Sequence, residues 1–291
     1  MPVGGISLRH CYNLSCANYT QISPQGRKLR KIVIIMLLAI DIGNTHTVIG
    51  VYAGDSLRAM WRIATNRKAA ADELRIVFST LFSLESLDLS QVRASAVASV
   101  VPQLTKAWMQ AIKDATGARS LVCNAETAEG LFDADYPNPR EIGADRVADA
   151  VAARAIYGAP VVVVDFGTAT NIEVIDRDGR FRGGVIAPGV QTSANALFTH
   201  GAQLPDIALV APPAVIGTNT VEAIQSGIML GEADRVDGLV RRIFDQLGYS
   251  AKVIATGGLA PVVERYSSTI DEVNTELTLE GLRLIADRAY R

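Results

Sequence analysis

The stretch Leu37-Leu38-Ala39-Ile40-Asp41-Ile42-Gly43-Asn44-Thr45 decides the fold, and a related one, Val161-Val162-Val163-Val164-Asp165-Phe166-Gly167-Thr168, occurs later in the chain. In both, an apolar run leads into aspartate, glycine and threonine. Short apolar runs of this kind are typical of buried strands, and a glycine behind the strand lets the backbone approach a ligand closely. A carboxylate and a hydroxyl there can hold a phosphate chain and its cation. Two copies predict a duplicated domain closing on one nucleotide.

The segments around the two stretches follow the same order in each half. Gly54-Asp55 and Arg177-Asp178-Gly179-Arg180 are turns between strand-like runs, which predicts a hairpin at the start of each half. Strands followed by helices give mixed sheets with helices outside. The fold class is therefore α/β, with two duplicated domains, 36–150 and 151–291, a boundary between 144 and 160, and a nucleotide cleft between the domains. We expect strands at 37–42, 47–52, 57–63, 94–101, 121–123, 161–165, 171–175, 181–186 and 251–255, and helices at 70–84, 104–115, 189–198, 221–247 and 279–290, the last capped by Thr278.

Composition narrows the function. The chain has 291 residues, 49% hydrophobic and 20% charged, which fits two globular domains. Its net charge of −2 predicts no binding to nucleic acid or to a membrane surface. Three cysteines and three histidines make a zinc site or a disulfide framework unexpected and favour a reducing cytoplasm.

Residues 1–35 differ from the rest of the chain. They are polar and lack periodicity, and Met36 opens the first predicted strand. We expect this N-terminal extension to be disordered or to follow a misassigned start. The basic residues before the apolar run 32–40 resemble a signal peptide, but no small-residue cleavage site follows, and the run is far shorter than the roughly 20 residues that span a membrane.

The first motif has the chemistry of a phosphate site without a P-loop. There is no GxxxxGK[ST] and no GxGxxG after a strand, and no lysine stands beside either motif. Phosphate charge must then meet backbone N–H groups, hydroxyls, arginine and metal. Asn44, Thr45 and Thr47 offer donors, and Asp41 is expected to hold a hydrated Mg²⁺. The alternative is a plain tight turn in which amides satisfy Asp41.

Asp165 and Asp145 are the other candidate carboxylates. Asp165 ends a valine strand, where burial is costly unless a cation or donors face it, and Thr168 and Thr170 could bind phosphate oxygens. Asp145 lies in the first turn of a predicted helix opened by Gly143-Ala144-Asp145-Arg146, where the macrodipole is expected to lower its pKa. It can still accept a hydroxyl proton late in phosphoryl transfer. As alternatives, Asp165 accepts turn N–H groups and Asp145 only stabilises its helix.

The full set of motifs resembles the type III pantothenate kinases of the superfamily of actin-like ATPases and sugar kinases. The matching stretches are 37–52 (LLAIDIGNTHTVIGVY), 136–146 (YPNPREIGADR), 161–170 (VVVVDFGTAT), 183–189 (GGVIAPG), 217–227 (GTNTVEAIQSG) and 255–259 (ATGGL). The resemblance implies actin/ribonuclease-H-like domains and ATP-dependent phosphorylation of the primary hydroxyl of pantothenate, the first step of coenzyme A biosynthesis. Asn171 stands where family members often carry threonine.

The resemblance also implies roles for individual residues. It assigns Asp145 as proton acceptor and Asp165 as ligand of a monovalent cation, K⁺ or NH₄⁺. It further implies a homodimer with the substrate pocket near the subunit interface. The ATP contacts it implies are Asp41, Ile42, Gly43, Asn44, Thr45, His46, Thr47, Val48 and Thr168, with Mg²⁺ on Asp41 through water. The pantothenate contacts it implies are Tyr136, Gly143, Ala144, Asp145, Arg146 and Thr220.

Two other functions stay open on the sequence alone. One is a non-catalytic transcriptional accessory factor on the same scaffold, which the two aspartate motifs, the intact 143–146 motif and the lack of a basic face argue against. The other is a sugar kinase of the same superfamily. The zinc signature CxHxGxxxxCxxxC of one common sugar-kinase branch is missing.

Overall fold

A computed structural model describes residues 16–22, 28–200 and 208–290. The chain divides into two compact units, one reaching Cys123 and including the chain from Leu282 onward, the other Asn124–Gly281. This division differs from the expected boundary between 144 and 160. The domains 36–150 and 151–291 remain a prediction.

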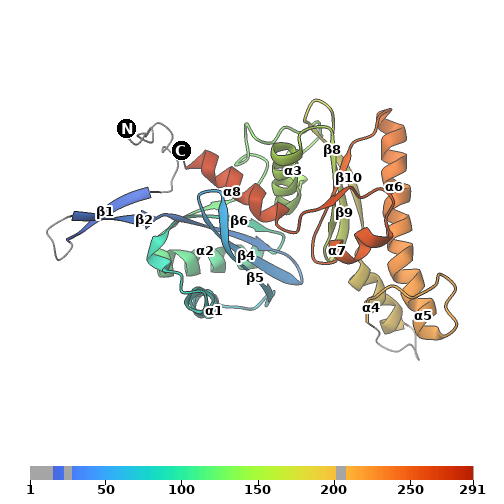
Figure 1. The fold of residues 1–291 in the computed structure, drawn as a ribbon, viewed down its shortest axis with the longest axis horizontal. Coiled ribbons are helices and arrows are strands. Elements are labelled where there is room, and N and C mark those ends of the chain that lie inside the picture. The colour runs from blue at the N-terminus through green and yellow to red at the C-terminus, as the bar shows by residue number, and fades with distance from the viewer. Residues whose placement is uncertain (1–15, 23–27, 201–207, 291) are drawn as a thin grey trace, which may run out of the picture. The chain divides into compact units, whose positions relative to one another are not determined.

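The first unit is built on a five-stranded mixed sheet of strand order β5-β4-β3-β6-β7. Strand β3 is central and antiparallel to β4, while β6 runs parallel to it. The pairs α1·α2 and α2·β6 are in contact, and Figure 1 shows both helices on the same side of the sheet. The elements are β3 (Met36–Ile42), β4 (His46–Ala53), β5 (Ser56–Ala64), α1 (Ala71–Leu84), a 3₁₀ turn (Leu89–Gln91), β6 (Val92–Ser99), α2 (Pro102–Thr116) and β7 (Arg119–Val122).

Strand β3 is an almost continuous apolar run, and nearly all of its residues are buried. Leu38, Ile40 and Ile42 pack with Phe78 of α1 and Trp108 of α2 in one core cluster. Trp108 is 1% exposed, so its indole is fully part of this core. Directly after α8 (Leu277–Ala289), the Tyr290 hydroxyl donates to the Ser95 carbonyl of β6 at 3.2 Å.

The second unit repeats this topology with the order β10-β9-β8-β11-β12. Again the first strand is central, its hairpin partner is antiparallel, and the strand on its other side is parallel. In Figure 1, α3 and α6 flank opposite faces of this sheet. The elements are a 3₁₀ turn (Pro139–Glu141), α3 (Ala144–Tyr157), β8 (Val161–Phe166), β9 (Ala169–Ile175), β10 (Phe181–Pro188), α4 (Val190–His200), α5 (Thr220–Gln225), α6 (Gly231–Leu247), β11 (Lys252–Thr256), α7 (Ala260–Val263), a 3₁₀ turn (Glu264–Tyr266), β12 (Glu272–Val273) and the start of α8.

The repeated sheet confirms the predicted α/β fold of two duplicated halves. Asp41 and Asp165 each occupy the next-to-last position of the central strand. The two predicted hairpins are present, with Gly54 and Gly179 at positive φ of 60° and 78°. Four consecutive valines, Val161–Val164, are fully buried because β8 is covered on both faces.

Some predicted boundaries need correction. Helix α8 begins at Leu277, so Thr278 lies inside it and is not its cap; its side chain hydrogen-bonds the buried Asp149 instead. The helix predicted at 221–247 is interrupted by a π-helical segment, Ser226–Leu230. The strand predicted at 121–123 runs from Arg119 to Val122.

Ahead of the first unit's sheet, β1 (Cys16–Ile22) and β2 (Lys28–Ile34) pair antiparallel. That residues 1–35 are disordered or follow a misassigned start stays a prediction, and the N-terminal mass of the native protein tests it. Among the described residues, no helix is both long and apolar enough to cross a membrane.

Candidate active site

The turn between β3 and β4 holds the first motif. The Gly43 N–H donates to the His46 carbonyl at 3.0 Å, and Thr65 Oγ1 donates to the Gly43 carbonyl at 2.8 Å. A Cβ on Gly43 would lie 2.9 Å from the His46 oxygen, which explains the glycine. Asn44, Thr45 and His46 are exposed. The turn is therefore tightly fixed at its base and open at its tip.

Thr47 differs from its neighbours. Its side chain is buried, and its hydroxyl shares a 2.9 Å hydrogen bond with the hydroxyl of Thr65. The hydroxyl that the sequence offered as a phosphate donor thus supports the turn. Any ligand contact of Thr47 would use its backbone.

Arg67 is a residue that motif reasoning missed. Its Nη2 donates to Asn44 Oδ1 at 2.7 Å. With its oxygen engaged, the Asn44 amide presents its NH₂ group as a donor, and the guanidinium adds positive charge where the sequence has no lysine. Arg67 and Asn44 are brought together by the hairpin of β4 and β5, which returns the chain to the motif, so the pair is visible only in the folded structure.

The oxygen donors of this turn suit magnesium. Asp41 is half-buried near the end of β3, at the base of the turn. Mg²⁺ at nucleotide sites keeps several waters and uses one or two carboxylates together with phosphate oxygens. In the described segments, no group of three or more His, Cys, Asp and Glu side chains gathers to hold a metal. One carboxylate with water and ATP oxygens fits what Asp41 provides.

The second motif forms the corresponding turn between β8 and β9. The Gly167 N–H donates to the Ala169 carbonyl at 3.0 Å. The Asp165 carboxylate is lined by glycine, since a Cβ on Gly257 would lie 2.4 Å from its Oδ1. Thr168 is exposed, and its carbonyl accepts from Thr192 Oγ1 at 2.6 Å. Thr170 turns inward, and its hydroxyl donates to Glu232 Oε1 at 2.6 Å. The sequence predicts that this hydroxyl can donate to phosphate, but its proton is used by Glu232.

Helix α3 begins with the motif 143–146. Asp145 is half-buried, and its Oδ1 accepts the Arg146 N–H at 2.9 Å. A Cβ on Gly143 would lie 2.5 Å from that same oxygen. Burial raises the pKa of Asp145 above its ordinary value, although the Arg146 N–H and charge oppose this. The expectation that the helix field lowers this pKa was wrong, because desolvation outweighs the dipole.

Arg146 reaches from α3 to the sheet. Its Nε lies 3.0 Å from Glu173 Oε1 of β9, and its guanidinium lies over the Phe181 ring at 5.4 Å. Tyr136 packs against the same ring with centroids 6.1 Å apart. A Cβ on Gly183 would lie 3.5 Å from the Tyr136 ring, an ordinary van der Waals distance, so the ring packs over this glycine of β10.

The face of the second sheet that α3 covers is rich in carboxylates. Asp149 and Glu173 are 1% and 0% exposed. Burial raises the pKa of Glu173 to about 8, Asp165 and Asp145 add to the increase, and Arg146 opposes it. The pKa of Asp149 is raised for the same reason, with Asp165 and Glu173 contributing. The acids on this face are therefore electrostatically linked, and burial favours their neutral forms.

The structure thus gathers Tyr136, Gly143–Arg146 and the Asp165 region within the second unit. Thr220 is the exposed first residue of α5, behind the cap Asn219. In the described part of the chain it shares no hydrogen bond, ion pair or ring contact with those residues. The segment 41–48 belongs to the first unit.

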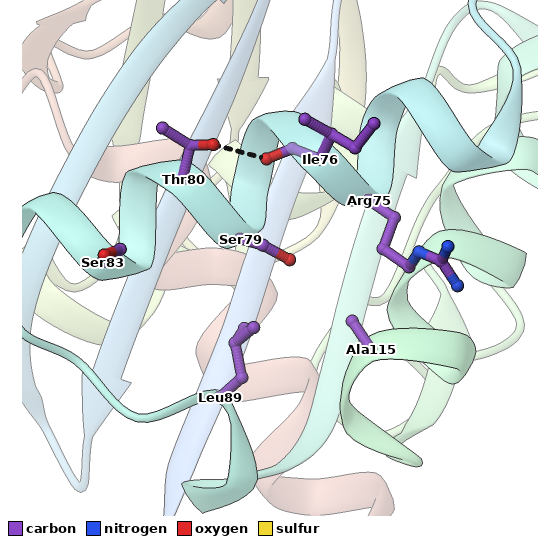
Figure 2. A pocket seen from close by; sticks show the side chains of 7 residues that line it. All are labelled: Arg75, Ile76, Ser79, Thr80, Ser83, Leu89 and Ala115. Carbon is purple, nitrogen blue, oxygen red and sulfur yellow. Dashed lines mark hydrogen bonds between the residues drawn. The ribbon is translucent and has the colours of Figure 1, made fainter.

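A pocket of about 470 Å³ lies elsewhere in the first unit, lined by α1, the 3₁₀ turn Leu89–Gln91 and the end of α2 (Figure 2). In the wall of the pocket, the Thr80 hydroxyl donates a hydrogen bond to the Ile76 carbonyl (Figure 2). The distance between the two oxygens is 2.8 Å. None of the predicted site residues lines it. Its lining residues are Arg75, Ile76, Ser79, Thr80, Ser83, Leu89 and Ala115.

Comparison with known proteins identifies the family. The family model described as type III pantothenate kinase matches residues 37–242. The chain belongs to the type III pantothenate kinase family. Type III pantothenate kinases from Moorella thermoacetica and an Anaeromyxobacter species are 43% and 46% identical over 253 residues, which is 87% of this chain and 99% of each relative.

Solved structures agree on the fold. The ethanolamine utilization protein EutJ from Carboxydothermus hydrogenoformans superimposes with a TM-score of 0.53 at 15% identity, covering 86% of this chain and 90% of its own. At that identity the likeness shows a shared fold alone. The pantothenate kinase relatives carry the functional argument.

Proposed function

We infer that the chain transfers the terminal phosphoryl group of ATP to the primary hydroxyl of pantothenate. The product is 4'-phosphopantothenate, and the reaction is the first step of coenzyme A biosynthesis. The observation that carries this conclusion is the family match over 37–242, which includes both aspartate motifs and the segment 143–146. Neither a transcriptional accessory factor nor a sugar kinase is favoured, because the curated relatives are named type III pantothenate kinase.

Turnover of pantothenate with Mg²⁺–ATP tests this function. We expect equal amounts of ADP and 4'-phosphopantothenate, identified by mass. Glucose and N-acetyl sugars offered in competition should not be phosphorylated. A purified, folded protein that binds ATP and never forms phosphopantothenate would refute the conclusion.

Asp145 is the proposed proton acceptor. Phosphoryl transfer depends mainly on positioning and charge stabilisation, so a carboxylate that accepts the hydroxyl proton late is sufficient. The raised pKa of Asp145 supports this role, because a more basic carboxylate accepts the proton more readily.

Asp41 to Val48 and Thr168 are the proposed ATP contacts, with Asp41 holding Mg²⁺ through water. The exposed tip at Asn44, Thr45 and His46 and the charge of Arg67 support binding of the phosphates. The bound magnesium would neutralise phosphate charge. Asp41→Asn should raise the KM for ATP and the Mg²⁺ concentration that gives half-maximal rate.

Asp165 is the proposed ligand of a monovalent cation, K⁺ or NH₄⁺. Asp165 lies close enough to Asp149 and Glu173 for their charges to interact unfavourably, and a cation at Asp165 would offset that repulsion. We expect turnover to rise when K⁺ or NH₄⁺ replaces a bulky organic cation at constant ionic strength. The effect should disappear in Asp165→Asn.

The proposed pantothenate contacts are Tyr136, the segment 143–146 and Thr220. Thr220 lies on α5, apart from the contacts that join Tyr136 and Arg146. The KM of Thr220→Ala for pantothenate tests its proposed role. We also propose a homodimer, which light scattering of the purified protein tests. A cytoplasmic location follows from the requirement for ATP and is tested by cell fractionation.

A further inference from the structure

Glu173 and Phe181 belong to no motif that the proposed function uses, yet both contact Arg146. We propose that Glu173 and Phe181 are positioning residues that fix the Arg146 guanidinium, and with it Tyr136, for the substrate. The inference rests on the proposed role of Arg146 and Tyr136 as pantothenate contacts. It adds two residues, on β9 and β10, that act through them.

The first step is the path of Arg146 across the sheet. Glu173 pairs with Gly184 in the register of β9 and β10. A Cβ on Gly184 would lie 3.2 Å from Arg146 Nη2, so the absent side chain leaves the space that the guanidinium occupies. Through this gap Nε reaches Glu173 Oε1 at 3.0 Å.

The second step concerns the N–H donors of the Arg146 guanidinium that these contacts leave unused. A guanidinium is a planar fork with five N–H donors. Glu173 takes the Nε edge, and the Phe181 ring covers one face at 5.4 Å. Only 11% of the Arg146 side chain is exposed. The Nη groups are the donors left for a ligand, with Nη2 beside Gly184, and their orientation is set by the contacts with Glu173 and Phe181.

The third step is that Phe181 serves two side chains. Arg146 lies over its ring, and Tyr136 packs edge-on against it with an interplanar angle of 62°. Tyr136 is ten residues before Arg146 in sequence and lies in a loop, so its own backbone does not fix its ring. A shared aromatic platform places the phenol and the guanidinium in one fixed relation.

The fourth step is burial. Glu173 has no exposed surface, and its Oε2 has no hydrogen-bond partner among the described residues. A buried carboxylate with one oxygen unsatisfied is costly to a fold. Packing alone would be served better by an apolar residue, so a role in orienting Arg146 explains why a carboxylate is placed there.

The experiment compares Glu173→Ala with Glu173→Gln in the full-length protein. Ala removes the acceptor of the Nε–H bond, whereas Gln keeps a carbonyl oxygen at the same position. We expect Glu173→Ala to raise the KM for pantothenate about tenfold or more and to leave the KM for ATP within about twofold. Glu173→Gln should recover most of the pantothenate affinity. Glu272→Gln is the matched control, because it removes a carboxylate of the same unit that pairs with Lys252 at the surface.

A purely structural role predicts a different result. Glu173→Ala would then melt at lower temperature with both KM values unchanged, and that outcome overturns the proposal. Removing one partner of a buried pair can prevent folding. Phe181→Leu then decides, because it leaves the ion pair intact and removes the platform: we expect a raised KM for pantothenate alone, and an unchanged KM refutes the inference.

The wild-type protein separates this inference from the proposed function. If it makes no phosphopantothenate, the function fails and the variants are not informative about it. If it does and Glu173→Ala leaves the KM for pantothenate unchanged, only the positioning role fails.

Discussion

Asp237 of α6 holds the segment after the last 3₁₀ turn, and replacing it with asparagine should destabilise the second unit. Its Oδ1 accepts from Ser267 Oγ at 2.5 Å and from Thr269 Oγ1 at 2.7 Å, and its Oδ2 accepts from the Ser268 N–H at 2.8 Å. Burial alone would raise the pKa of Asp237, but these donors outweigh it and lower the pKa to about 2. The charged carboxylate is therefore what the loop binds.

The magnitude follows from linkage. The ordinary pKa is 3.8 and the folded value is about 2, so the charged form contributes about 2 kcal/mol to the free energy of unfolding. Because the folded pKa is lowered, this contribution is complete above pH 3.8 and is lost as the pH falls from 3.8 to about 2. A loss of this size corresponds to a melting temperature lower by about 5–10 °C in a unit of this length.

Urea unfolding of Asp237→Asn at several pH values checks the reasoning. We expect the difference from the wild type to be constant between pH 7 and pH 5 and to shrink below pH 4. Asp234→Asn removes an exposed carboxylate from the same helix and should change little. A difference that persists unchanged at pH 3, or a control as unstable as Asp237→Asn, would refute the linkage argument.

Three further changes have sharp expectations. Asp145→Ala should lose most of kcat with the fold intact. In the wild type, kcat should fall on the acid side at a pH above 3.8, because burial raises the pKa of the Asp145 carboxylate, which must be ionised to accept the proton. A rate that does not change with pH contradicts the role of Asp145. Gly184→Ala should prevent folding or strongly lower the melting temperature, since its Cβ would lie 1.7 Å from the Ile172 carbonyl oxygen. Gly227→Ala is the control, because its Cβ meets nothing within 4 Å and the variant should fold. Equal melting temperatures of the two variants would contradict the close approach at Gly184. Arg67→Ala should raise the KM for ATP several-fold without changing that for pantothenate, measured by initial rates, and an unchanged KM for ATP removes Arg67 from the phosphate site.

Much of the fold was predictable because its signals are local. The valine run before Asp165 predicts a strand covered on both faces, and Gly179 predicts the hairpin turn that follows. The repeated Asp-Gly-Thr motif predicted the duplication, which the matching strand orders of the two sheets confirm. The error at Thr278 has a physical cause, since its hydroxyl hydrogen-bonds a buried carboxylate from another helix, and no local pattern reveals that partner.

The candidate site was only partly readable. Residues 41–48 stand out because glycine and polar residues follow an apolar strand. Residues 143–146 stand out because glycine and polar residues open a helix. Arg67 and Glu173 do not, because each acquires its meaning from a partner 23 or 27 residues away. The pKa of Asp145 had the wrong predicted sign for the same reason: sequence shows the helix start, but burial depends on what packs over it.

The sequence by itself determined the strands, the hairpins, the duplicated halves and the family, because each depends on residue type at short spacing. Tertiary structure alone decided which side of each motif faces inward, as at Thr47 and Thr170, and which charges meet in the interior. Hydrogen bonds and desolvation act through space between strands and helices that are distant in the chain. Only the packed fold brings Arg146, Glu173 and Phe181 into contact.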